Sequence, residues 1–127
     1  MQIVSMQAID ATWYRWEDPE CSRREVIQFC YGADWAYIGR GYGFYPNNFA
    51  ESPLANPFYR NGGKRGSTLG RYRQWLWEKM RVKDEAMMRA LRSFSAETIL
   101  ICHCPQPGPC HGHVITAAWE WLQTQRE

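Results

Sequence analysis

The sequence predicts an α/β protein: a small single-domain layered sheet, parallel or mixed, packed by three or more helices. The clearer segments follow the order strand, long loop, two helices, strand, short loop and helix. The apolar run in 97–104 is nearly continuous, which is typical of a strand buried on both faces. A chain of 127 residues, 45% of them hydrophobic, fits one folded domain over 1–127 and excludes a disordered protein.

The first third of the chain gives the weaker signals. Residues 2–8 alternate weakly and predict an edge strand. Residues 22–32 read as a short helix or strand, and the spacing of their apolar residues favours a helix. We expect Cys21 to be a loop thiol and Cys30 to be a small buried residue.

A buried strand is predicted at 35–41, where aromatic and β-branched residues run up to a glycine. Residues 41–66 then carry turn signals without a sustained period, which makes a loop longer than compact domains usually contain without a function. Its aromatic side chains either stack on a base or cover an edge of the core. They are Tyr42, Phe44, Tyr45, Phe49, Phe58 and Tyr59.

Three helices are predicted in the second half. The first follows a cap at Ser67 or Thr68 and repeats apolar residues at helical spacing up to Met80. The second covers about 83–94, and the last follows the "CHGH" segment. We expect the last helix to bury five apolar side chains: Val114, Ala117, Ala118, Trp121 and Leu122.

Charge and cysteine usage limit the partners and the compartment. The net charge of +2 is too mild to indicate a nucleic-acid binder, although lysine and arginine gather in 64–83, which is either a nucleic-acid contact or a solvated helix face. The sequence has neither a membrane-spanning run nor a secretion signal, so we expect a cytoplasmic protein without a membrane partner. Five cysteines without an export signal favour reduced thiols or metal ligands over disulfides.

The segment "ILICHCPQPGPCHGH", 99–113, holds three of the five cysteines and all three histidines. It spans the end of a strand, a turn and the start of a helix, which is where α/β proteins bind ligands. In one interpretation this segment is a zinc site with four ligands. The ligands are Cys102, Cys104, Cys110 and His111, and His113 is an alternative to His111.

Two other interpretations of this segment stay open. Cys110 lies at a helix N-terminus, where a thiol is activated as a nucleophile, with His111 or His113 as its acid/base partner. Alternatively, the cysteines pack as small hydrophobic residues and cap the last helix.

Arg40 and Asn56 are the candidate ligand-binding residues of the long loop. A guanidinium after the strand offers a planar clamp for phosphate or carboxylate, and the amide before Pro57 is able to bond a ligand. With the cysteine cluster at the same sheet edge, they predict a site for a small anionic or nucleotide-like ligand. The rival function is a non-catalytic, zinc-stabilised module that binds protein or nucleic acid.

Four segments in order, "YIGRG", "SPLANPF", "YRQWLWEKM" and "ILICHCPQPGPCHGHVI", resemble domain-of-unknown-function family 4326, small proteins of bacteria and their phages. The resemblance covers about 35–121. The family pattern falls on Tyr37–Arg40, Ser52–Phe58, Tyr72–Leu76, Cys102, Cys104 and Cys110–Gly112. The chain departs from it at Ala55, where the family usually has glycine. The resemblance implies which residues matter, and it carries no established activity.

Overall fold

The computed structural model describes residues 1–44, 47–58, 63–64, 66–104 and 108–125. These residues form a layered α/β fold with a parallel sheet, as the sequence predicts. The elements, in chain order, are β1 (Gln2–Ser5), α1 (Met6–Trp16), α2 (Arg23–Tyr31), β2 (Trp35–Tyr37), α3 (Leu69–Arg81), α4 (Glu85–Arg92), β3 (Ile99–Cys102) and α5 (His111–Thr124).

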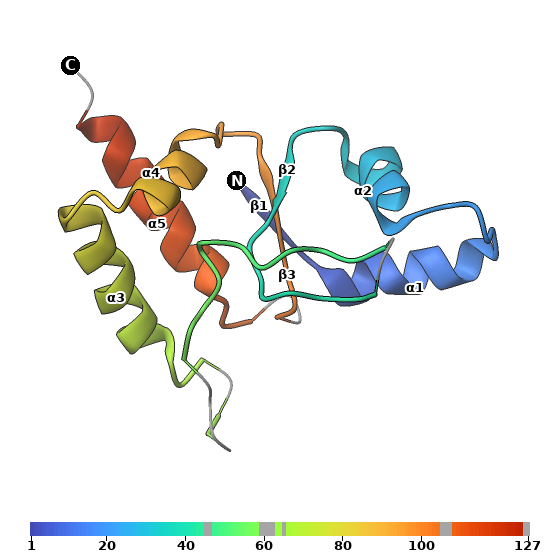
Figure 1. Ribbon diagram of the computed structural model, residues 1–127, viewed down its shortest axis with the longest axis horizontal. Coiled ribbons are helices and arrows are strands. Elements are labelled where there is room, and N and C mark those ends of the chain that lie inside the picture. Colours follow the sequence, from blue (N-terminus) through green and yellow to red (C-terminus); the bar gives the residue numbers. More distant parts are fainter. Residues whose placement is uncertain (45–46, 59–62, 65, 105–107, 126–127) are drawn as a thin grey trace.

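The sheet has the strand order β1-β3-β2, with β3 parallel to both neighbours. Ser5 pairs with Cys102, and Tyr37 pairs with Ile101. The three carboxyl ends therefore meet at one edge of the sheet, from which α1 and the long loop start (Figure 1). The first cysteine of the predicted site stands at this edge.

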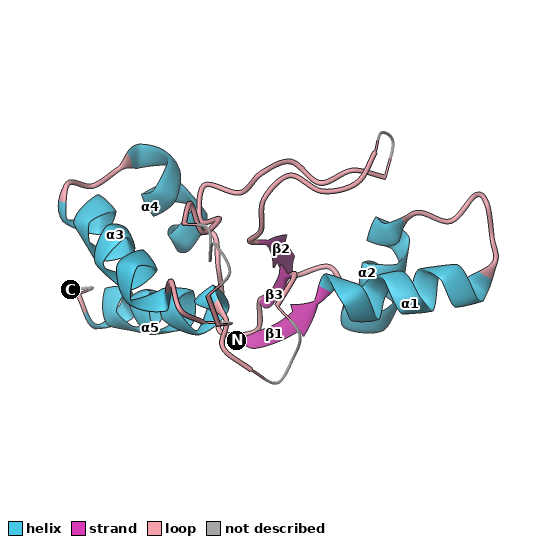
Figure 2. Ribbon diagram, turned by 90° about the horizontal axis from the view of Figure 1, so that it is seen from below, coloured by secondary structure: helices cyan, strands magenta, loops and turns pink. Residues whose placement is uncertain are grey.

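The central strand supplies two hydrophobic cores, because its side chains alternate between the two faces of the sheet. Leu100 and Cys102 belong to the core formed with α3, α4 and α5. Ile99 and Ile101 belong to the core formed with α1 and α2. All four β3 residues are buried, which confirms the strand predicted from the apolar run. Figure 2 shows the two helical groups on opposite sides of the strands.

Helix α1 is an element that the sequence analysis missed. The strand predicted over 2–8 ends at Ser5, and residues 6–8 are helical. The Ser5 hydroxyl accepts a hydrogen bond from the Gln7 amide at 3.2 Å and so caps the helix at the last strand residue. Met6 and Ile9 face the core.

Cys21 lies in the loop between α1 and α2, as predicted, but the burial of the two N-terminal cysteines differs from the expectation. Cys21 is buried in the core beneath α1 and α2, whereas Cys30 is exposed. Helix α2 is present as the spacing favoured, and it buries Val26 and Ile27. Its last turn lies beyond this core, so Cys30 and Phe29 face solvent.

The long loop is held to the first two helices by hydrogen bonds to a largely buried ion pair between Asp10 and Arg23. Arg23 Nε lies 2.6 Å from Asp10 Oδ1, and the Tyr42 hydroxyl donates to the other oxygen of Asp10 at 2.5 Å. Arg23 also donates to the Asn47 carbonyl at 2.9 Å. Phe49 is buried and Phe44 is exposed, while the predicted Tyr45 and Tyr59 lie outside the described residues. Phe49 in the described part of this loop thus covers a core edge.

Helix α5 packs on the core with three of the five predicted side chains, because Ala118 is buried and Val114 and Leu122 pack against the same core while partly exposed. His111, Gly112, Ile115 and Ala118 are buried, whereas Trp121 is 43% exposed and Ala117 is also exposed. Trp121 instead lies edge-to-face against Trp77 of α3, with ring centroids 5.0 Å apart. The helix therefore buries His111, Gly112 and Ile115 in addition to part of the predicted stripe.

None of the helices in the described ranges combines the length and the apolar character needed to cross a bilayer.

Candidate metal centre

Three cysteine thiols converge at the carboxyl edge of the sheet. Cys102 ends β3, Cys104 follows two residues later, and Cys110 directly precedes α5. Their Sγ atoms all lie within 4.8 Å of one another, and those of Cys102 and Cys110 are 3.2 Å apart. Cys102 and Cys110 are buried and Cys104 is half-buried. Residues 105–107 of the connecting turn lie outside the described residues.

The local sequence explains why Cys110 reaches this position. It is the N-cap residue of α5, and its sulfur accepts a hydrogen bond from the Gly112 amide at 3.3 Å. A Cβ at Gly112 would lie 2.9 Å from Ile3 Cδ1 and 3.3 Å from Ile38 Cδ1. Glycine therefore lets the first turn of α5 pack directly on the sheet, which brings the capping thiol to the end of β3.

His111 is the histidine that joins the thiols. Its Nε2 lies 2.7 Å from the Ile38 carbonyl oxygen, which only accepts hydrogen bonds, so Nε2 carries a proton and donates it. Burial acts to lower the pKa of His111, but hydrogen bonds with Cys104 and Cys110 and the bond to Ile38 outweigh it and raise this pKa to about 9. The ring also lies edge-to-face against Tyr72, at 5.3 Å between centroids.

The thiols differ in the charge state that their surroundings favour. Hydrogen bonds from Cys102 and then Cys110 lower the pKa of Cys104 far below the usual thiol range, and His111 adds to this effect. Hydrogen bonding to Cys104 and Cys110 raises the pKa of Cys102. These contacts favour the charged form at Cys104 and the neutral form at Cys102. The nucleophile's role that the sequence analysis offered for Cys110 stays a prediction.

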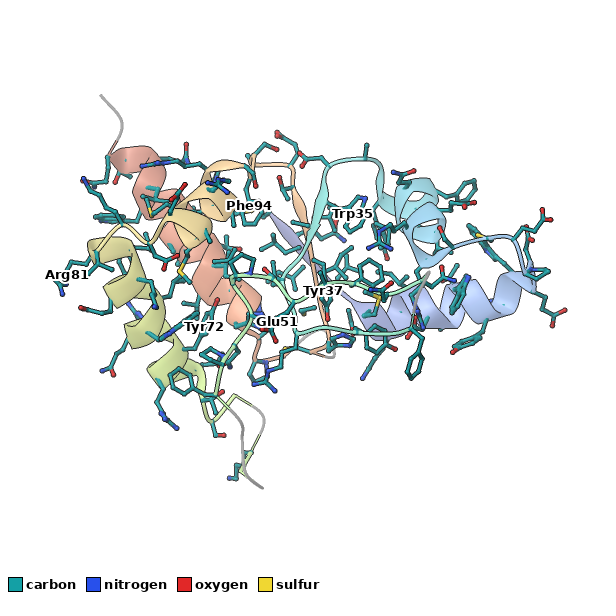
Figure 3. All side chains as sticks on the ribbon, viewed as in Figure 1. Trp35, Tyr37, Glu51, Tyr72, Arg81 and Phe94 are labelled. Atoms are coloured by element: carbon teal, nitrogen blue, oxygen red, sulfur yellow. The ribbon has the colours of Figure 1, made fainter. Side chains whose placement is uncertain are left out.

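The other two histidines lie elsewhere. His103 is on the opposite face of the strand end from Cys102, and its Nε2 is 2.8 Å from the Tyr37 hydroxyl. His113 is exposed on α5. Figure 3 shows the labelled Tyr37 and Tyr72 on opposite sides of the central strand. Of the two histidines that the sequence left as alternatives, the structure brings His111 to the thiols.

Arg40 and Asn56 bond to each other within the long loop. Arg40 donates to the Asn56 carbonyl through Nε at 2.9 Å and Nη2 at 2.6 Å, and Nη2 also donates to the Phe58 carbonyl at 2.9 Å. The Asn56 side chain accepts from the Phe58 amide and donates to the Thr68 hydroxyl, each at 2.9 Å. Both side chains thus hold the loop's backbone, and their role in ligand binding stays a prediction.

Ile38 and Tyr72 lie in segments that match the family pattern, but the sequence analysis gave them no role at the cluster. The Ile38 carbonyl orients His111, and no pattern in the sequence marks a backbone oxygen for this role. Tyr72 is fully buried, packs on His111 and donates its hydroxyl to the Leu54 carbonyl at 2.7 Å. Its helical spacing indicated a core residue, and Tyr72 is indeed in the core. The spacing could not show that Tyr72 also links α3 to the loop through Leu54 and to the cluster through His111.

A family model described as "Domain of unknown function (DUF4326)" matches residues 21–121. The chain belongs to this family. The DUF4326 match contains all residues of the cluster and begins at Cys21, so it includes α2 and is longer than the 35–121 expected from the motifs. No similar curated protein and no similar solved structure were found.

Proposed function

We propose that this DUF4326 protein binds one zinc ion through Cys102, Cys104 and Cys110, and that the metal fastens the start of α5 to the end of β3. The observation that carries this proposal is the mutual approach of the three Sγ atoms to within 4.8 Å. Thiolate-rich sites favour zinc over the hard cations, which prefer oxygen ligands.

His111 is the fourth ligand in this proposal. Histidines that bind metals usually donate their second ring N–H to a backbone carbonyl or a carboxylate, which fixes the tautomer and the ring orientation. The bond from His111 Nε2 to Ile38 has this form and leaves Nδ1 to the cluster. Three cysteines and one histidine make a common structural zinc set.

The burial of the ligands favours a structural metal over a catalytic one. Cys102 and Cys110 are almost fully buried and His111 is 7% exposed, so four protein ligands would close the coordination sphere. Cys110 also caps α5 through its sulfur. These observations support the zinc-stabilised module more than an enzyme in which Cys110 attacks a substrate.

The zinc content of purified protein tests the proposal. Native mass spectrometry and elemental analysis of protein produced with zinc are expected to find one zinc per chain. Cys102→Ser and Cys110→Ser are expected to lose it, while the matched controls Cys21→Ser and Cys30→Ser, which lie outside the cluster, keep it. Zinc-free wild-type protein, or equal loss from the controls, would contradict the proposal.

Thiol chemistry at Cys104 is the second candidate, because this half-buried thiol is accessible and interacts with His111. In metal-free protein, iodoacetamide at pH 7 is expected to alkylate Cys104 before Cys30, whose exposed thiol makes it the reference. Faster reaction at Cys30 would remove this candidate.

A small anionic or nucleotide-like ligand beside Arg40 and Asn56 has weaker support, since both side chains bond the loop itself. Nucleic-acid binding through 64–83 rests on the basic surface of α3; Arg65 lies outside the described residues. Titration with single-stranded oligonucleotides tests it, and an affinity that does not fall with salt would count against this surface.

A further inference from the structure

We infer that the cluster is a peroxide-sensitive redox site in which Cys104 is oxidised first and a disulfide between Cys102 and Cys110 is the product. The disulfide rests on the geometry of the thiols alone. Its effect on metal binding rests on the proposed function, because a zinc ion must be present to be released.

The distance between the two sulfurs selects the pair that joins. Cys102 and Cys110 Sγ are 3.2 Å apart, so a movement of about 1 Å brings them to the disulfide bond length of about 2.0 Å. Cys21 is buried in the other core, and Cys30 is exposed on α2. Neither is placed to compete for this bond.

Access to solvent selects the thiol that reacts first. Cys102 is 0% exposed and Cys110 is 1% exposed, whereas Cys104 is half-buried. A peroxide arriving from solvent therefore meets the Cys104 sulfur. Accessible thiolates with a second thiol close by are the usual sites of reversible oxidation.

The reaction uses one peroxide and forms one disulfide. The Cys104 thiolate attacks a peroxide oxygen, the O–O bond breaks, and the hydroxide released takes a proton to become water, which leaves a sulfenic acid. The Cys110 thiol then attacks the Cys104 sulfur and loses its proton, and the S–O bond breaks with loss of a second hydroxide, which takes up a proton to become water. The Cys102 thiol attacks the Cys110 sulfur, gives up its proton and displaces Cys104 as thiolate. Overall, Cys102 and Cys110 lose two electrons in total, and these electrons reduce one peroxide to two molecules of water.

The disulfide removes two of the three sulfur ligands of the proposed zinc site. A disulfide sulfur carries no negative charge and no longer binds zinc as a thiolate does. Oxidation is therefore expected to release the metal and to loosen the link between β3 and α5, and a reductant with zinc restores both.

Differential labelling of intact protein tests the inference. Zinc-loaded and chelator-treated samples are exposed to hydrogen peroxide, blocked with iodoacetamide, reduced, and labelled with N-ethylmaleimide. Cleavage after Glu97 and Glu120 gives the peptide 98–120, which contains all three thiols. The expected pattern is the first label on Cys104 and the second on Cys102 and Cys110, with one zinc released per disulfide in the loaded sample.

Variants test the order of events. Cys30→Ser is expected to behave as wild type, whereas Cys104→Ser is expected to form the disulfide at least tenfold more slowly, because the accessible thiol is lost. An equal rate in Cys104→Ser would overturn the role of Cys104. Labelling of wild type needs no variant: irreversible oxidation of Cys104 without a disulfide, or a disulfide to Cys21 or Cys30, would overturn the inference.

The two proposals fail separately. Protein that carries no zinc but still forms the Cys102–Cys110 disulfide would refute the metal site and keep the redox site. Protein that holds one zinc, yet forms no disulfide in either sample, would keep the metal site and refute the redox site.

Discussion

Three consecutive residues at the start of α5 have separate tasks. Cys110 caps the helix, His111 bonds the Ile38 carbonyl, and Gly112 allows the helix to approach the sheet. Because each task depends on the position of the same helical turn, a change in one residue is expected to disturb the others.

Gly112→Ala is expected to be less stable than Gly70→Ala by about 1 kcal/mol, because its Cβ would lie 2.9 Å from Ile3 Cδ1 and 3.3 Å from Ile38 Cδ1, and these side-chain ends must shift. Gly70→Ala in α3 is the matched control: its Cβ would meet nothing within 4 Å, and alanine favours a helix by about 1 kcal/mol. Urea unfolding measures both variants. Equal effects of the two changes would show that contact with the sheet is not the cause.

The paired charges of Cys104 and His111 predict how the metal-free protein responds to pH. The lowered pKa of Cys104 gives stability that is complete above pH 9.0, the usual thiol pKa, and is lost as pH falls. The pKa of His111 rises from 6.5 to about 9, so its contribution is complete below pH 6.5 and is lost towards pH 9. The two trends oppose each other between pH 6.5 and pH 9. The contribution of Cys104 and His111 together to the free energy of unfolding is therefore expected to stay constant over this range.

Replacing the histidine separates the two contributions. The metal-free His111→Gln variant lacks the contribution of His111 to stability, which falls as pH rises. Hydrogen bonds from Cys102 and Cys110 still favour the Cys104 thiolate in this variant. Stability is therefore expected to rise from pH 6.5 to pH 9 relative to wild type, as measured by urea unfolding at several pH values. A level profile in the variant would contradict the thiolate assignment.

At the scale of the elements, the sequence predicted the helices with one buried face and the strand that is buried on both faces. It missed a helix that begins directly after a strand, with no turn between them. The helices α3 and α4 and the strand β3 are found where periodicity placed them. Helix α1 follows β1 without any intervening residue, and Ser5 serves both as the last strand residue and as the cap. A weak alternation therefore continued past the true end of the strand.

The Asp10–Arg23 pair is expected to be the most costly ion pair to break among those in the described residues, because it links α1, α2 and the long loop. Its side chains are 17% and 9% exposed, and Arg23 also lies over the rings of Trp13 and Tyr42. Asp10→Ala leaves a buried guanidinium without its carboxylate, which costs about 3 to 5 kcal/mol.

The solvent-exposed Glu85–Arg89 pair of α4 is the control for this prediction. Its side chains are 85% and 73% exposed, so Glu85→Ala is expected to change the free energy of unfolding by less than about 0.5 kcal/mol. Thermal and urea unfolding compare the two variants. A small loss in Asp10→Ala would mean that the pair does not hold the loop to the helices.

At the scale of the whole molecule, the cysteine cluster could be located from the sequence but its internal order could not. Grouped cysteines and histidines after a buried strand indicated the right sheet edge. The choice of His111 over His113 depends on the rotation of α5, and the contacts of Arg40 depend on how residues 52–58 fold back. Both follow from tertiary packing, which a local pattern does not encode.

Metal removal is expected to loosen the two cores unequally. Cys102 and Cys110 belong to the core with α3, α4 and α5, while α1 and α2 pack on the other face. A chelator is therefore expected to lower the melting temperature and to speed amide hydrogen exchange in α5 and α3 more than in α1 and α2. Uniform acceleration would show that the metal stabilises the fold as one unit, and no acceleration would contradict a structural metal.

The parallel pairing of β1 with β3 has a consequence for biosynthesis. The first strand leaves the ribosome long before its partner, because α1, α2, β2, α3 and α4 lie between the two strands in the sequence. Contacts so distant in sequence form late and slow the folding of small domains. The nascent chain must therefore carry the apolar residues of β1 and α1 without their final partner until Ile99–Cys102 emerge, and the cysteine cluster is assembled only after Cys110 has also left the ribosome.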